Sequence, residues 1–190
     1  MECILYKILR FLFSPIFKIL YMPKIIGKEN ILDNGGLVIA SNHKHAMDPL
    51  MIILATKRVI HYLAKKELYK GILKVFFNAV GTLPVDRKNK NPNTISKAEE
   101  VLKSGGVIGI FPEGTRNRTK EDLLPFKKGA VSFAKNTNSK IVPVYIKGEY
   151  KFFRKSLVII IGEPYRVKGN LEEENEILRE KILKLKETKY

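Results

Sequence analysis

The chain has 190 residues, 45% of them hydrophobic, so it is long enough for one domain with a sizeable core and is not a disordered polypeptide. Its single cysteine, Cys3, excludes an intramolecular disulfide framework and a cysteine-rich zinc site. The 35 lysines and arginines outnumber the 19 aspartates and glutamates, and the formal net charge of +16 indicates an anionic partner: nucleic acid, a phosphorylated metabolite or an anionic membrane surface.

The N-terminal residues 3–22 are mostly apolar, and their polar side chains recur at a helical spacing. One stripe of the expected helix carries Lys7, Arg10, Ser14 and Lys18. These charges and Pro15 argue against a membrane-spanning helix, and the interrupted apolar stretch is a poor signal peptide. We expect residues 1–22 to form an amphipathic membrane-associating segment, as one in-plane helix or as two helices broken at Pro15. The alternative is a helix that packs on the core of the domain that follows, residues 23–190.

A candidate catalytic pair follows the first strongly apolar strand. Residues 37–40 are typical of a buried strand, and residues 49–57 are expected to form a helix. His43 therefore lies where a strand ends and Asp48 where a helix begins, and a strand-to-helix turn can bring the two side chains together. Asp48 would then hold one ring nitrogen of His43 while the other nitrogen faces a cleft, an arrangement used in acyl transfer. The alternative is that Asp48 only caps the helix and that His43 is an ordinary loop residue.

Strands and helices alternate through the rest of the chain. The further expected strands are residues 59–64, 81–87, 107–111, 141–146 and 157–161. The further expected helices are residues 66–80, 94–103, 130–136 and a C-terminal helix capped by Asn170. The helix over 66–80 carries on one face Leu68, Ile72, Val75, Phe76 and Ala79. Several strands are apolar on both faces, which predicts an α/β sandwich with a largely parallel or mixed sheet flanked by helices.

Two more groups of candidate residues lie just past expected strand ends. Arg87 follows one strand, and Glu113, Gly114 and Arg116 follow another. Ligands of such sheets gather at the carboxyl ends of the strands, so we expect these residues on the same rim as His43. The alternative is a cluster of surface salt bridges.

Four blocks of sequence together resemble the glycerolipid acyltransferase family, and within it the 1-acylglycerol-3-phosphate (lysophosphatidic acid) acyltransferases. In chain order the blocks are Asn42-His43-x-x-x-x-Asp48, Gly81-x-x-Pro84-Val85-Asp86-Arg87, Phe111-Pro112-Glu113-Gly114-Thr115-Arg116 and Val142-Pro143-Val144. They cover about residues 42 to 144. One departure is His45, which stands where many members have serine.

The resemblance implies a function and a role for each site residue. His43 would be the general base and Asp48 its orienting partner. The glycerol phosphate acceptor would be bound by Arg87, Glu113, Gly114 and Arg116, with Lys127 nearby. The reaction would pass a fatty acyl group from acyl-CoA or acyl-carrier protein to the free hydroxyl of lysophosphatidic acid, giving phosphatidic acid for phospholipid biosynthesis. The enzyme would need no cofactor and would sit at the cytoplasmic face of the cell membrane as a peripheral or monotopic protein. Glycerol-3-phosphate and other lysophospholipids stay open as alternative acceptors.

The chemistry of this reaction requires the same residue types. A glycerol hydroxyl is a poor nucleophile near neutral pH, and imidazole, with an ordinary pKa of about 6.5, is suited to take its proton. Arginine binds phosphate through two parallel hydrogen bonds. The chain has no Gly-x-Ser-x-Gly motif, and Cys3 lies in the N-terminal segment, so we expect direct attack on the thioester without an acyl-enzyme.

Two other functions share single features with this sequence. His43-Lys44-His45 with Asp48 resembles a metal-dependent hydrolase loop, but only His61 remains as a further imidazole ligand, so we expect no metal. A basic nucleic-acid-binding module would need exposed stacking aromatics or a known motif. The aromatic residues fall at core spacings instead, so we expect no nucleic acid.

Overall fold

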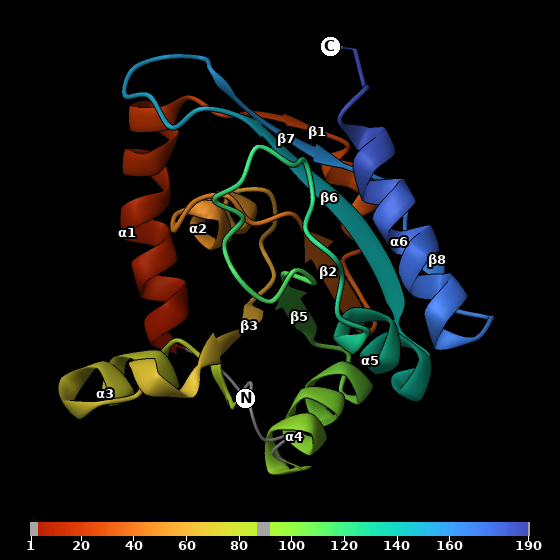
Figure 1. The fold of residues 1–190 in the computed structure, drawn as a ribbon. Coiled ribbons are helices and arrows are strands. Elements are labelled where there is room, and N and C mark those ends of the chain that lie inside the picture. The colour runs from red at the N-terminus through yellow and green to blue at the C-terminus, as the bar shows by residue number, and fades with distance from the viewer. Residues whose placement is uncertain (1–3, 87–91, 190) are drawn as a thin grey trace.

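The structure is a computed structural model that describes residues 4–86 and 92–189. Its centre is a mixed β-sheet (Figure 1). The strands are β1 (Lys24–Ile26), β2 (Leu37–Ser41), β3 (Ile60–Lys65), β4 (Leu83–Val85), β5 (Val107–Ile110), β6 (Lys140–Gly148), β7 (Leu157–Ile161) and β8 (Tyr165–Arg166). In the part of the chain that is described they form one sheet in the order β1-β7-β6-β2-β5-β3-β4, with β8 paired to β6. The pairs β6–β7 and β6–β8 are antiparallel, and the others are parallel.

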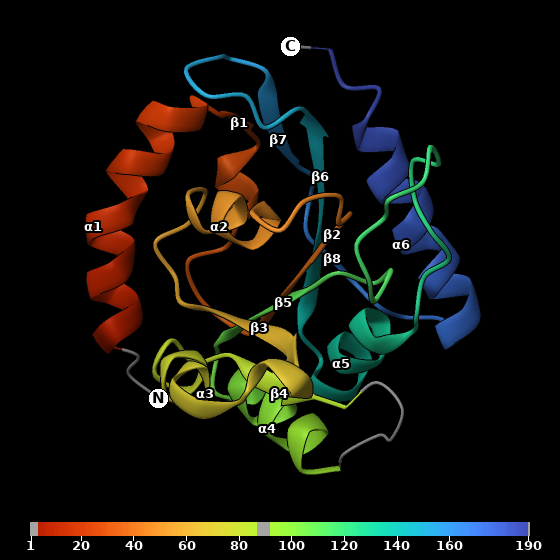
Figure 2. The same ribbon diagram turned by 60° about the vertical axis from the view of Figure 1, so that its left-hand side comes forward.

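Helices cover both faces of this sheet (Figures 1 and 2). They are α1 (Ile4–Tyr21), α2 (Asp48–Ile53), α3 (Gly71–Ala79), α4 (Pro92–Lys103), α5 (Gly129–Thr137) and α6 (Leu171–Leu185), with short 3₁₀ helices η1 (Lys28–Asn30) and η2 (Lys66–Leu68). Helices α4, α5 and α6 pack on one face through one hydrophobic core cluster. Helix α2 and the C-terminal half of α1 pack on the other face through a second cluster.

Strand β2 shows how the sequence serves both clusters. Successive side chains of a strand point to opposite faces of the sheet. Leu37 and Ile39 accordingly join the cluster under α1 and α2, and Val38 and Ala40 join the cluster under α4, α5 and α6. Because both faces are covered, the strand is a continuous apolar run rather than an alternating one. The predicted α/β fold with a mixed sheet is confirmed, and β2 ends at its centre, where the candidate pair begins.

The region expected to be one helix over residues 66–80 differs from that prediction. It divides into η2 and α3, and none of the residues of α3 is buried. Ile72 is 84% exposed, and Leu68, Val75 and Phe76 are exposed as well. The physical reason is position: α3 lies beside the sheet, next to the start of α1, and not over a sheet face (Figures 1 and 2). The helix expected over 49–57 is also shorter and ends at Ile53.

The N-terminal segment forms one continuous helix with Pro15 inside it, rather than two helices. Its inner side carries Tyr6 and Tyr21, which are both buried. Its outer side carries large exposed apolar residues: Ile4, Ile8, Phe11, Leu12, Ile16 and Ile19. Within the described ranges, none of the helices has the length and apolar character needed to cross a membrane. The division of the chain at residue 22 stays a prediction.

Candidate active site

The turn between β2 and α2 brings the candidate pair together. The Nδ1 atom of His43 lies 2.9 Å from Oδ2 of Asp48. The same oxygen accepts the backbone N–H groups of Lys44 and His45, each at 2.8 Å. Asp48 is the first residue of α2, and its carboxylate is bound by the turn before the helix and not by the helix N–H groups. The alternative in which Asp48 only caps the helix is therefore wrong.

The hydrogen bonds of Asp48 define the tautomer of His43. The Asp48 residue is 1% exposed. A carboxylate has no proton to donate, so it can only accept hydrogen bonds. Nδ1 of His43 therefore carries the proton that it donates to Asp48, and in the neutral imidazole Nε2 has the lone pair. That lone pair is what a general base needs.

Tyr150 is a partner of Asp48 that the sequence pattern did not reveal. It lies just after β6, and its hydroxyl donates to Oδ1 of Asp48. Burial is the main cause that raises the pKa of Tyr150, and the Asp48 carboxylate raises it further, so the phenol stays protonated and keeps donating. The ring of Tyr150 also stacks on His45, with centroids 4.1 Å apart. Tyr150 and Asp48 are 102 positions apart along the chain, so no local motif could indicate their contact.

Aromatic rings fix the plane of the His43 imidazole. Phe111 follows β5, and its ring is stacked on His43 with centroids 4.0 Å apart and an angle of 19° between the planes. The ring of Tyr62, from β3, lies nearly parallel to Phe111 at 5.8 Å. The hydroxyl of Tyr62 donates to the carbonyl of Pro49. His43 is thus held at Nδ1 and on one ring face.

Glu113 ties the two loops of the site to each other. Its Oε1 accepts the backbone N–H of His43 at 2.7 Å, and its Oε2 accepts the N–H of Leu124 at 2.8 Å. The side chain is 4% exposed, and burial raises the pKa of Glu113 although both N–H groups act in the opposite direction. Both oxygens therefore serve the backbone behind His43 and do not point into open space.

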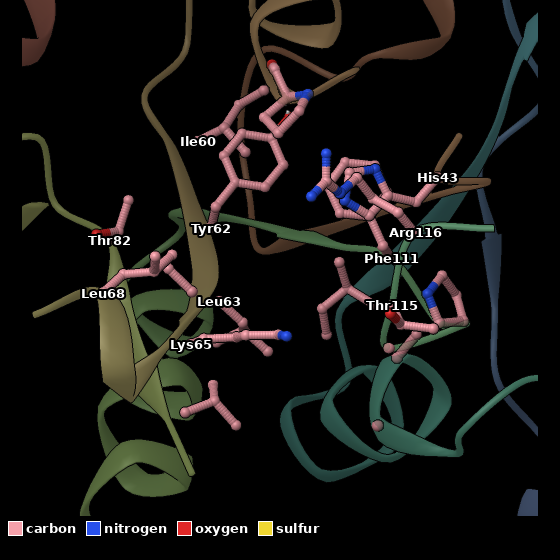
Figure 3. A pocket seen from close by; sticks show the side chains of 18 of the residues that line it. His43, Ile60, Tyr62, Leu63, Lys65, Leu68, Thr82, Phe111, Thr115 and Arg116 are labelled. Carbon is pink, nitrogen blue, oxygen red and sulfur yellow. Dashed lines mark hydrogen bonds between the residues drawn. The ribbon is translucent and has the colours of Figure 1, made fainter. Parts of the chain in front are cut away.

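Gly114 and the cationic candidates belong to the segment between β5 and α5. Gly114 has a φ of +68°, in the left-handed region that favours glycine, and a Cβ atom there would come within 2.9 Å of Lys127. Arg116 and Lys127 both line the same cavity as His43. Figure 3 shows Arg116 close to His43 and Phe111. Arg87 lies outside the described residues. Four of the seven predicted site residues thus line one cavity: His43, Gly114, Arg116 and Lys127. Asp48 and Glu113 are buried and bonded to His43, and Arg87 is not described.

This cavity has a volume of about 1650 Å³. Its apolar wall comes from α1, α2 and α3, and includes Leu9, Phe13, Phe17, Leu50, Ile53 and Phe76. Its basic wall includes Lys65, Arg116, Arg118, Lys127 and Lys128. His43 lines the same cavity as both sets of side chains. An amphiphilic anion is the class of molecule that such a cavity fits.

The histidines of the metal-hydrolase alternative do not converge. His61 is buried in β3 and bonds through Nδ1 to the carbonyl of Gly81 at 2.7 Å. His45 stacks on Tyr150, and its Nδ1 accepts the N–H of Met47. Across residues 4–86 and 92–189 there is no group of three histidine, cysteine or acidic side chains placed to share a metal ion.

Residues 23–147 match the model of the Acyltransferase family. The chain belongs to this family, and it is an acyltransferase. It is 37% identical to the 1-acyl-sn-glycerol-3-phosphate acyltransferase of Bacillus subtilis over 147 residues, which cover 74% of this chain and 72% of that protein. It is 35% identical over 141 residues to the protein of the same name from Borreliella burgdorferi, covering 73% of this chain and 56% of the relative.

A solved structure has the same fold. It is the crystal structure of the 1-acyl-sn-glycerophosphate (LPA) acyltransferase PlsC from Thermotoga maritima, with a TM-score of 0.70 and 26% sequence identity. The match covers 88% of this acyltransferase and 73% of that chain. The resemblance deduced from the four sequence blocks is therefore confirmed at the level of the family.

Proposed function

We propose that this acyltransferase transfers a fatty acyl group from an acyl thioester to the free hydroxyl of 1-acylglycerol-3-phosphate, giving phosphatidic acid. The observation that carries the proposal is that His43, bonded to Asp48, lines one cavity together with apolar and cationic side chains. The names of the relatives from Bacillus subtilis and Borreliella burgdorferi support the same acceptor.

In the proposed reaction Nε2 of His43 takes the proton of the acceptor hydroxyl as its oxygen attacks the thioester carbonyl. Asp48 stabilises the imidazolium that forms and keeps its ring oriented. The new C–O bond forms, the C–S bond breaks, and the proton passes from His43 to the leaving thiolate. No acyl-enzyme is involved, and no cofactor is needed.

The phosphate of the acceptor binds to the cationic wall. Arg116 and Lys127 are exposed on that wall, and guanidinium and ammonium groups hold phosphate strongly. Gly114 lets the backbone approach the ligand, and Arg87 is proposed to join this set from the segment that is not described. Glu113 is proposed to act through the backbone of His43, because its Oε1 is bound to the N–H of His43 and its Oε2 to the N–H of Leu124.

The apolar wall receives hydrocarbon chains. A cavity of about 1650 Å³ exceeds the roughly 300–1,000 Å³ of a typical small-molecule site. This size favours an acceptor that already carries a chain over glycerol-3-phosphate, because donor and acceptor chains would then lie together. The exposed apolar side of α1 supports a peripheral position on an anionic membrane surface, which we place at the cytoplasmic face.

The proposal is tested by incubating the purified protein with lysophosphatidic acid or glycerol-3-phosphate, each with acyl-CoA or acyl-carrier protein as donor. We expect phosphatidic acid from lysophosphatidic acid at a higher kcat/KM than any product from glycerol-3-phosphate. Faster acylation of glycerol-3-phosphate would overturn the assigned acceptor. Mass spectrometry of the protein with donor alone should show no acylated serine or cysteine, and such an adduct would overturn direct attack.

A further inference from the structure

The connection between β6 and β7 carries an unusual exposed sequence. Its tip reads Lys151-Phe152-Phe153-Arg154-Lys155, two phenylalanines flanked by three cations. Phe152 is 61% exposed and Phe153 is 67% exposed. Two neighbouring exposed aromatic rings are costly for a water-soluble surface and mark a contact with an apolar partner.

This loop, residues 149–156, has a defined conformation. Ser156 donates through its hydroxyl to the carbonyl of Glu149, and the N–H of Glu149 bonds to the carbonyl of Ser156. The N–H of Phe153 bonds to the carbonyl of Leu20 in α1 at 2.6 Å, and the ring of Phe152 lies 5.3 Å from the ring of Tyr21. Phe153 has a φ of +56°, a conformation that a bulky residue rarely adopts. The exposed rings are therefore held in place at the C-terminal end of α1.

The loop extends a surface that other elements begin. It lies at one end of α1 and α3 lies at the other end, on the same side of the molecule (Figures 1 and 2). An 18-residue helix is about 27 Å long, so α1 separates the loop from α3 by roughly that distance. The exposed apolar residues of α3, α1 and the loop are called the apolar band. This band borders the substrate cavity, because α1 and α3 also supply its apolar wall.

The charges on this band identify what covers it. Exposed cations occur along it at Lys7, Lys18, Lys74, Arg154 and Lys155. Apolar side chains interleaved with cations suit an anionic lipid surface, where the rings enter the acyl region and the cations meet phosphates. A second copy of this chain is disfavoured, because the two surfaces would repel each other and each chain has a net charge of +16.

We propose that the loop over residues 149–156 is a second bilayer-docking element, which inserts Phe152 and Phe153 between anionic lipids beside α1. This inference rests on the proposed function, since it concerns how the enzyme meets a lipid acceptor. The loop also contains Tyr150, whose hydroxyl holds Asp48, so the docking element and the catalytic pair belong to one connected segment.

The absence of tryptophan from the sequence allows a direct test. Full-length Phe152→Trp and Phe153→Trp each carry one indole as a reporter. Ile177→Trp, on the exposed side of α6 across the sheet, is the matched control. Each protein is mixed with vesicles of phosphatidylglycerol and phosphatidylcholine that contain brominated acyl chains. We expect a blue shift and strong quenching for the two loop variants and neither effect for Ile177→Trp.

A second pair of variants measures the contribution to binding. Phe152→Ser/Phe153→Ser should bind these vesicles at least about tenfold more weakly, because two buried rings are lost. Ile177→Ser should bind like the wild type. Turnover of a short-chain, fully dissolved lysophosphatidic acid should stay within about twofold of wild type, given that the rings do not line the cavity.

Three outcomes would overturn the inference. Indoles of the loop variants that stay in water while the protein is vesicle-bound would show that α1 alone docks. A failure of the wild type to bind vesicles would remove the bilayer as partner. A blue shift that appears on raising protein concentration without lipid would identify a second copy instead. Acyl transfer measured in the same samples separates these results from a failure of the proposed function.

Discussion

The hydroxyl of Tyr150 donates to one oxygen of Asp48 while the other oxygen holds His43 at 2.9 Å. The carboxylate is therefore fixed from both sides, by a residue that follows β6 and by the turn that follows β2. Replacement of this hydroxyl should disturb the His43–Asp48 pair without creating a cavity in the core. We expect Tyr150→Phe to lower kcat about tenfold, in keeping with the loss of a hydrogen bond to a charged group, and to leave KM for the thioester nearly unchanged.

Tyr165→Phe is the matched control for that experiment. Its hydroxyl is buried and has no hydrogen-bond partner within the described residues, so its removal takes away an oxygen but no bond. We expect a kcat equal to that of the wild type. Equal losses in the two variants would show that Tyr150 acts only through packing.

Asp48→Asn should reduce both activity and stability. The two oxygens of Asp48 accept from Lys44, His45 and Tyr150, and an amide places an NH₂ group against at least one of these donors. We expect the free energy of unfolding to fall by about 2–4 kcal/mol, because a buried network is broken on one side. Urea unfolding measures this loss. An Asp48→Asn protein as stable as the wild type would contradict the buried, fully bonded carboxylate.

Glu113 should give stability a specific dependence on pH. Burial raises the pKa of Glu113 above its ordinary 4.5, so the folded protein keeps this proton to a higher pH than the unfolded chain does. The contribution of Glu113 to the free energy of unfolding is therefore largest below pH 4.5, and it is lost as the pH rises through the raised pKa. The free energy of unfolding is measured for wild type and Glu113→Gln at several pH values. We expect the value for the wild type to fall relative to that of Glu113→Gln as the pH rises. A difference that moves the other way would contradict the raised pKa.

Arg116 should act on acceptor binding. We expect Arg116→Gln to raise KM for lysophosphatidic acid about tenfold or more, because a charge-assisted contact to phosphate is lost, and to change KM for the thioester little. Lys120→Gln removes the same charge from the same loop but does not line the cavity, so its KM should match the wild type. Similar effects in both variants would indicate a general electrostatic field and not a binding contact.

The sequence predicted those features that depend on local pattern. The apolar runs of β2 and β5 indicated strands buried on both faces, and the spacing of His43 and Asp48 indicated a turn that joins them. Tyr150 could not be predicted, because its contact with Asp48 joins distant segments through the pairing of β6 with β2. The buried position of Glu113 likewise depends on where the loop after β5 folds.

The exposed helix α3 shows a second limit. Periodicity correctly marks an apolar face at Ile72 and Phe76, but it does not say whether protein or lipid covers that face. The same holds for α1, which packs Tyr6 and Tyr21 inward and shows Ile8 and Leu12 outward. A deletion of residues 1–22 would thus remove part of the core and of the cavity wall together with the proposed membrane contact, so the point variants above are the cleaner test.

The most direct test of the account is the single-turnover rate of phosphatidic acid formation by wild type and His43→Ala at saturating lysophosphatidic acid and acyl thioester. We expect a rate at least about a hundredfold lower in the variant, the usual contribution of a general base. Urea unfolding should show that the variant remains folded. A folded His43→Ala protein that forms phosphatidic acid as fast as the wild type would contradict the mechanism.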